Sequence, residues 1–184
     1  AFFLSNLDLT DRLNVAQKIN SSLKGIFDGN PTILPIPDDS PVEFPRIILN
    51  SNDGVFSCNV SPARVDFIFN VSKLAPENKI KKDPKSYLLT NIDYLSSVVI
   101  TILNGSVYRL ACISEYKLHL KEGATAFLSK KVAEIFGKDA KELQIHKLEN
   151  IELSSFKTNH WLRFISTSRG TDNEFLHILS DMNT

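Results

Sequence analysis

The sequence predicts an α+β fold, in which a mostly antiparallel sheet has two long amphipathic helices packed on one face. Two stretches place apolar residues at helical spacing, and runs of alternating residues with strong turn signals follow each of them. Single strands and helices do not alternate strictly, which argues against a doubly wound or barrel fold. The expected order suggests one domain over residues 1–184 with two loosely duplicated β-α-β-β halves, at 1–71 and 83–184.

The first half is expected to begin with a strand over residues 1–7, followed by a helix through about Gly25. Asp8 or Thr10 can cap this helix, because their side-chain oxygens accept from free backbone N–H groups. An apolar stripe at helical spacing consists of Leu9, Leu13, Ala16, Ile19, Leu23 and Ile26. The Asp-Gly-Asn-Pro segment at 28–31 ends the helix, because proline cannot continue it.

A proline-rich connector and a β-meander are expected next. Four prolines stiffen the chain before residue 45. Strands are expected over 46–50, 55–60 and 64–71, because each is rich in β-branched or aromatic residues and two of them alternate clearly. An Asn-Asp-Gly turn at 52–54 joins the first two of these strands.

The second half is expected to open with a long helix. A polar, lysine-rich loop precedes it, and Asp83 and Pro84 begin it, since proline suits the first helical position. The apolar stripe of this helix consists of Leu88, Ile92, Leu95, Val99 and Ile102. Asn104 and Gly105 are expected to cap its end.

The remaining elements are expected to be mainly strands. A long strand is expected over 106–120, and a third helix is expected to end at Gly137. Strands are then expected over 143–153 and 156–167, followed by a final strand or short helix at 175–179.

Composition and charge narrow the classes of function. The chain has 21 basic and 21 acidic residues, so bulk electrostatics do not favour binding to a polyanion. No apolar run is long enough for a transmembrane helix, and we expect a cytoplasmic protein that makes no membrane contact. Cys58 and Cys112 lie in expected strands and are predicted to be buried thiols, although one disulfide stays possible.

Motifs for cofactors, metals and nucleophilic catalysis are missing from the sequence. No glycine-rich phosphate loop and no Cys-x-x-Cys pair occur. The four histidines are spread over the chain without metal-ligand spacing, and no nucleophile elbow is present. We therefore expect no cofactor, no metal site and no catalytic residue, and we interpret the chain as more consistent with a non-enzyme.

One enzymatic alternative is a metal-dependent nuclease or a related nucleic-acid-binding protein. Such sites need carboxylates that hold a divalent ion and a nearby lysine. Glu115 and Lys117 lie two residues apart in an expected strand and share one face, and Asp66 could join them. Two groups of lysines could contact nucleic acid, at Lys73, Lys79, Lys81, Lys82 and Lys85 and at Lys130, Lys131, Lys138 and Lys141.

A protein-contact surface is the more favoured interpretation. Trp161 and Arg163 share one face of an expected strand, whereas Leu162 and Phe164 lie on the other. Tryptophan and arginine are common anchors of protein–protein contacts. The alternative is that Trp161 packs under a helix. Arg46 and Arg64 flank the meander and are further candidates, either for an ion pair with Asp66 or for contact with an anion.

The meander also resembles a sporadically distributed, uncharacterised bacterial family. The residues that support the resemblance are Pro45, Arg46, Ser51, Asp53, Gly54, Val60, Ser61, Pro62, Arg64, Phe67 and Asn70. The resemblance implies an α+β fold and no established activity, so no catalytic residue is transferred from it. A patchy occurrence of such a family suggests an accessory role.

Together these observations predict a non-enzymatic binding or regulatory protein. We expect it to act through protein–protein contacts, with self-association into a homo-oligomer. A third class, a small-ligand sensor with a pocket between helices and sheet, stays open at this point.

Overall fold

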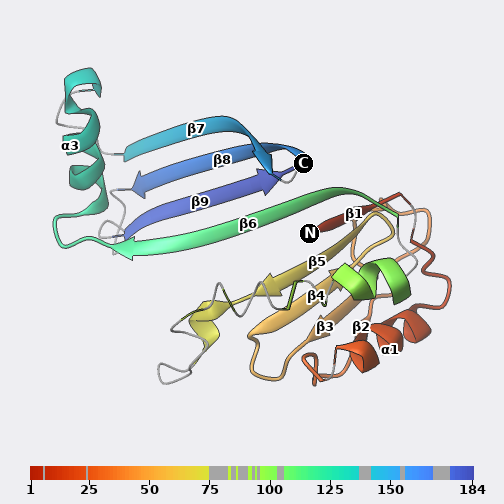
Figure 1. The fold of residues 1–184 in the computed structure, drawn as a ribbon. Helices are drawn as coiled ribbons and strands as arrows, with labels where there is room; N and C mark the ends of the chain where they lie inside the picture. Colours follow the sequence, from red (N-terminus) through yellow and green to blue (C-terminus); the bar gives the residue numbers. More distant parts are fainter. Residues whose placement is uncertain are drawn as a thin grey trace. The chain divides into compact units, whose positions relative to one another are not determined.

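The structure is a computed structural model. In it the chain forms two compact units, Ala1–Leu110 and Ala111–Thr184 (Figure 1). It describes residues 1–5, 7–23, 25–74, 83, 86, 91–92, 94, 96–102, 106–136, 142–153, 156–167 and 175–184. The boundary between the units falls within one strand. The expectation of one domain with halves at 1–71 and 83–184 stays a prediction, because compactness does not measure whether units unfold together.

The first unit contains an antiparallel sheet built around the expected meander. Its strands are β1 (Phe2–Leu4), β2 (Thr32–Ile33), β3 (Ile47–Asn50), β4 (Phe56–Val60), β5 (Arg64–Phe69) and the start of β6 (Val107–His119). Their hydrogen-bonding order is β2-β3-β4-β5-β1-β6. Gly54 has a φ of 68°, a conformation that favours glycine, and it allows the tight turn between β3 and β4. A 3-10 turn, η1 (Val71–Lys73), follows β5.

Helix α1 (Arg12–Ser22) packs on the core of this unit. Asp11 caps the helix, because its carboxylate accepts a hydrogen bond from the Asn14 backbone N–H. The buried cluster under the helix includes Leu4, Ala16, Ile19, Leu23, Phe27, Leu49 and Val65. Leu13 is 56% exposed, so the buried stripe is narrower than the sequence pattern indicated.

The predicted α+β class with two long amphipathic helices is wrong, because strands dominate and the helices are short. Helix α1 has 11 residues and ends at Ser22. Of the second expected helix the structure describes residues 83, 86, 91–92, 94 and 96–102, and residues 86, 91–92, 94 and 96–97 are α-helical. The described end of that segment, Val98–Ile102, forms a π-helical turn, η3. Among the helices that the structure describes, none is long and apolar enough to cross a membrane.

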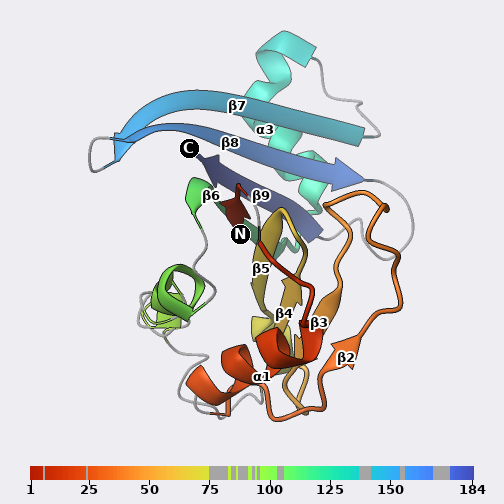
Figure 2. The same cartoon turned by 90° about the vertical axis from the view of Figure 1, so that its right-hand side faces the viewer.

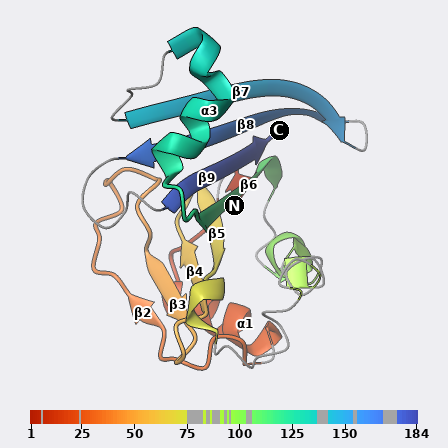
Figure 3. The same cartoon turned by 90° about the vertical axis from the view of Figure 1, so that its left-hand side faces the viewer.

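In its described residues, the second unit is a four-stranded antiparallel sheet with one helix. It contains the rest of β6, helix α3 (Ala124–Phe136), β7 (Glu142–Leu153), β8 (Phe156–Thr167) and β9 (Phe175–Asn183), in the order β6-β9-β8-β7. The last element is a strand, which settles the choice left open for residues 175–179. Helix α3 lies behind the strands in Figure 2 and in front of them in Figure 3, which shows the opposite side. It therefore covers one face of this sheet only.

Helix α3 covers the sheet face on which Leu162 and Phe164 lie. The cluster between helix and sheet contains Ala124, Leu128, Leu143, Leu176, Ile145, Phe164 and Ile178. Because side chains alternate along a strand, the odd-numbered residues of β8 project from the other face. Residues 161 and 163 therefore lie on the face that α3 leaves free.

The two thiols lie in very different surroundings. Cys58 is completely buried in β4, as expected, whereas Cys112 in β6 is exposed, so the prediction of a buried thiol is wrong there. Both cysteines are free. Burial raises the pKa of the Cys58 thiol, and the Asp66 carboxylate raises this pKa further. The thiolate of Cys58 is therefore strongly disfavoured in the folded chain.

We expect one thiol per native chain to react with an aromatic disulfide reagent at mildly alkaline pH, and two after denaturation in urea. The reacting group is Cys112, since the reagent attacks accessible thiolates. A Cys112→Ser variant should show no fast-reacting thiol in the native state. Two rapidly reacting thiols in the native protein would contradict the burial of Cys58.

Candidate functional site

The sheet face opposite α3, which we call the Trp161 face, gathers apolar and charged side chains from four strands. The register of the strands places these residues in two neighbouring rows, Leu148–Trp161–Asp181–Ile113 and His146–Arg163–Leu179–Glu115. Directly opposite residues in antiparallel strands lie about 5 Å apart at Cβ. The sequence prediction that Trp161 and Arg163 share a face opposite Leu162 and Phe164 is confirmed.

Two large apolar side chains are exposed on the Trp161 face. Ile113 is 64% exposed and Leu148 is 51% exposed, and Trp161 lies between their strands as a half-buried residue. No helix or strand in the described part of the second unit covers these side chains. Exposed apolar residues grouped around an aromatic ring are typical of contact surfaces.

Arg163 combines a stacked position with an incomplete hydrogen-bond set. Its Cζ lies 5.7 Å from the centre of the Trp161 ring, within the range of a cation–π contact. Its Nε atom is buried and has no hydrogen-bond partner among the residues that the structure describes. A buried donor without an acceptor costs about 1–3 kcal/mol, so this guanidinium would gain from an additional acceptor.

Arg46, a predicted contact residue, is instead buried inside the first unit. Only 1% of its surface is exposed. Its guanidinium donates to the carbonyl oxygens of Phe44, Ser40 and Pro41, at 3.1, 3.1 and 3.5 Å. These acceptors belong to the proline-rich connector, so Arg46 holds that connector against the sheet and is not available to a partner.

Arg64 forms the ion pair that the sequence suggested as one possibility. Its Nε atom lies 2.8 Å from Oδ2 of Asp66, on the same face of β5. The Phe3 ring lies across from both Arg64 and Arg109 in the ladder, with Cζ distances of 5.8 and 4.7 Å to the ring centre. Arg64 therefore neutralises Asp66 within a local arrangement of aromatic and charged groups.

The residues of the nuclease alternative do not assemble within either unit. Asp66 belongs to the first unit and is paired with Arg64, whereas Glu115 and Lys117 belong to the second. Glu115 Oε1 lies 4.0 Å from Nδ1 of His177 on the neighbouring strand. In the described ranges, no group of three histidine, cysteine, aspartate or glutamate residues could hold a metal ion.

A cluster that the sequence analysis missed lies on the face of α3, formed by Glu149, His160 and Ser180. His160 Nε2 lies 3.0 Å from Ser180 Oγ, and its Nδ1 lies 3.8 Å from Glu149 Oε2. A hydrogen bond from Lys147 lowers the pKa of the Glu149 carboxyl. The register of β7 and β8 places Glu149 directly opposite His160, and only this pairing of the two strands brings them together.

The chemistry of this cluster is limited by the sheet around it. A serine and a histidine within hydrogen-bond distance are the first requirement for nucleophilic catalysis. Ser180, however, lies in β9, which pairs with β6 on one side and β8 on the other. Its neighbouring backbone N–H groups serve the ladders, so they cannot stabilise an oxyanion.

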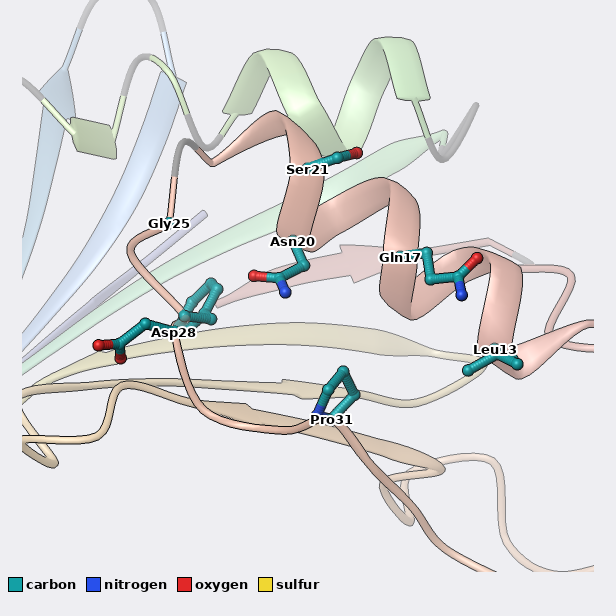
Figure 4. A pocket seen from close by; sticks show the side chains of 8 residues that line it. Leu13, Gln17, Asn20, Ser21, Gly25, Asp28 and Pro31 are labelled. Carbon is teal, nitrogen blue, oxygen red and sulfur yellow. The ribbon is translucent and has the colours of Figure 1, made fainter.

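A hollow of about 500 Å³ lies in the first unit, between α1 and the segment that follows it. Its lining includes Gln17, Asn20, Asp28 and Pro31. Figure 4 shows the Asn20 side chain extending from the helix into the space beside that segment. The Oδ1 atom of Asn20 is buried and accepts no hydrogen bond from any described residue. The hollow lies beside helix α1. A small-ligand sensor was expected to have its pocket between helices and sheet instead.

Comparison with known proteins adds no relationship: no protein-family model, no curated protein and no solved structure matches this chain. The resemblance of residues 44–70 to a bacterial family therefore rests on those residues alone.

Replacing Arg46 with methionine should lower the free energy of unfolding by about 2–4 kcal/mol, because three connector carbonyls lose their charged donor. The matched control is Arg64→Met, which removes a partly exposed ion pair and should cost less than about 1 kcal/mol. Urea denaturation followed by circular dichroism measures both variants. Equal losses would contradict the assignment of Arg46 as the residue that fixes the connector.

Proposed function

We propose that this chain is a non-enzymatic binding protein that acts through protein–protein contacts, with the Trp161 face as the contact surface. The observation that supports the proposal most is the stack of Arg163 on Trp161, in which a buried Nε–H has no acceptor among the described residues. A bacterial accessory role, which the resemblance of residues 44–70 implies, and a cytoplasmic location belong to the same proposal.

The chemistry of the face specifies the kind of partner. A carboxylate of the partner can accept hydrogen bonds from the terminal N–H groups of the half-buried Arg163 guanidinium. Ile113 and Leu148 present apolar surface in the next row. The partner segment therefore combines one acidic side chain with apolar neighbours, which contact Trp161 and exclude water from the ion pair.

The alternative is a nucleic-acid-binding or nuclease-like protein that uses Asp66, Glu115 and Lys117. The ion pair of Asp66 with Arg64 and the position of Glu115 beside His177 both count against that alternative. Nuclease activity would be detected by a cleavage assay with Mg²⁺.

The test uses two peptide arrays and the fluorescence of Trp161, which is the only tryptophan in the chain. In one array a single Glu stands between apolar residues, and in the matched array Gln replaces that Glu. We expect Glu peptides to shift the emission and to bind about tenfold to a hundredfold more tightly than their Gln counterparts, since hydrogen bonds to charged groups contribute about 1.5–3 kcal/mol.

An Arg163→Gln variant should lose the difference between the two arrays, whereas Arg109→Gln, a control in the first unit, should retain it. The proposal fails if no peptide changes the emission, or if Arg163→Gln still prefers Glu peptides. Cleavage of DNA or RNA in the presence of Mg²⁺, abolished by Glu115→Ala, would establish the nuclease alternative instead.

A further inference from the structure

Strand β7 (Glu142–Leu153) is the last strand of the ladder. Among the described strands it pairs with β8 alone and stands at the end of the ladder (Figure 1). The strand is 12 residues long and contains no proline. A long edge with free N–H and C=O groups is a template for another strand, and natural proteins usually shorten or interrupt such edges. Strand β7 is neither short nor interrupted by proline, so it can accept a partner strand, and its charged side chains decide which strand fits.

The residues of β7 are complementary to the same strand in a second copy. In an antiparallel pairing centred on Leu148, that leucine lies opposite itself, and Lys147 lies opposite Glu149 of the other copy. By symmetry this cross-strand ion pair forms twice. Ile145 then lies opposite Ile151, and His146 lies opposite Asn150, so apolar and polar positions match along the strand.

The two adjacent registers are less favourable. Residues that lie opposite each other must point to the same side of the sheet. The adjacent allowed registers therefore place the two-fold axis at residue 147 or at residue 149 instead of at 148. A shift in one direction places Lys147 opposite Lys147, and a shift in the other places Glu149 opposite Glu149. Each alternative brings like charges together at the two-fold axis, which is destabilising.

The residues on the side of α3 support this register. Ile145 is a partly buried residue that packs against the cluster under α3. Ile151 of the second copy would lie beside it and extend that apolar surface across the new ladder. Lys147 and Glu149 are already paired within one chain, so the dimer would join two such pairs into a network of four charges.

We propose that this protein forms a symmetric homodimer in which β7 pairs with β7 of a second copy, with Leu148 at the two-fold axis. The two sheets then join into one continuous antiparallel ladder. This proposal concerns the edge of the sheet, whereas the proposed binding function concerns its Trp161 face, and the two share Leu148. A dimer that binds no peptide, or a monomer that binds one, tells the two proposals apart.

The first test measures self-association by sedimentation equilibrium, where the wild type should have twice the chain mass of 20.7 kDa. Lys147→Glu and Glu149→Lys should each weaken the dimer about tenfold or more, because they bring like charges together at the axis. The double charge exchange should restore dimerisation, since it recreates both ion pairs. Circular dichroism checks that each variant is folded, and Trp161→Ala should leave the mass unchanged.

A second test locates the axis by cross-linking in a Cys112→Ser background, where the remaining Cys58 is buried. A single Leu148→Cys substitution should give disulfide-linked dimers under mild oxidation, because position 148 lies opposite itself. The matched His146→Cys variant should cross-link only when mixed with Asn150→Cys. A monomeric wild type, a charge exchange that does not restore the dimer, or equal cross-linking of both single variants would each overturn the proposal.

Discussion

The strict alternation of side chains along β7, β8 and β9 is the constraint on which the account of the second unit depends. Because neighbouring residues point to opposite faces, a single register decides which side chains α3 covers and which it leaves exposed. The same register sets Leu162 and Phe164 over the apolar cluster and Trp161 and Arg163 on the far side. A slip of one residue would exchange the two faces and expose the cluster under α3.

Two arginines show how differently the same side chain can be used in this protein. Arg46 is buried with three backbone carbonyls as acceptors, so its charge is compensated and its role is to hold the connector. Arg163 is half-buried on an aromatic ring, and its Nε atom has no acceptor in the described part of the chain. The acceptors of Arg46 within the chain tie it to the fold, whereas Arg163 lies at a sheet surface where we propose that a partner contacts it.

The meander and the faces of β8 could be predicted from the sequence, because turns at Gly54 and the alternation around Trp161 are local signals. The lengths of the helices could not be predicted, since an apolar stripe does not show where a helix begins and ends. In α1 the caps at Asp11 and Leu23 set these limits. Which of the candidate side chains are buried depends on tertiary packing. Arg46 and Arg64 flank the same meander and look alike in sequence, yet only one of them is buried.

The Glu149–His160–Ser180 cluster marks the same limit for the candidate sites. Its members come from three strands, and Ser180 joins Glu149 and His160 only through the register between β8 and β9. Side chains from separate strands become neighbours only once the whole ladder is known, so single-sequence motifs cannot reveal such a group.

Proton–proton distances around the Trp161 indole test the central claim most directly. Nuclear Overhauser effects measured in solution should connect the indole protons with the side chain of Leu148, its neighbour on β7, and should be absent between the indole and Leu128 of α3. Strong effects between Trp161 and Leu128 would place the tryptophan under the helix and contradict the Trp161 face.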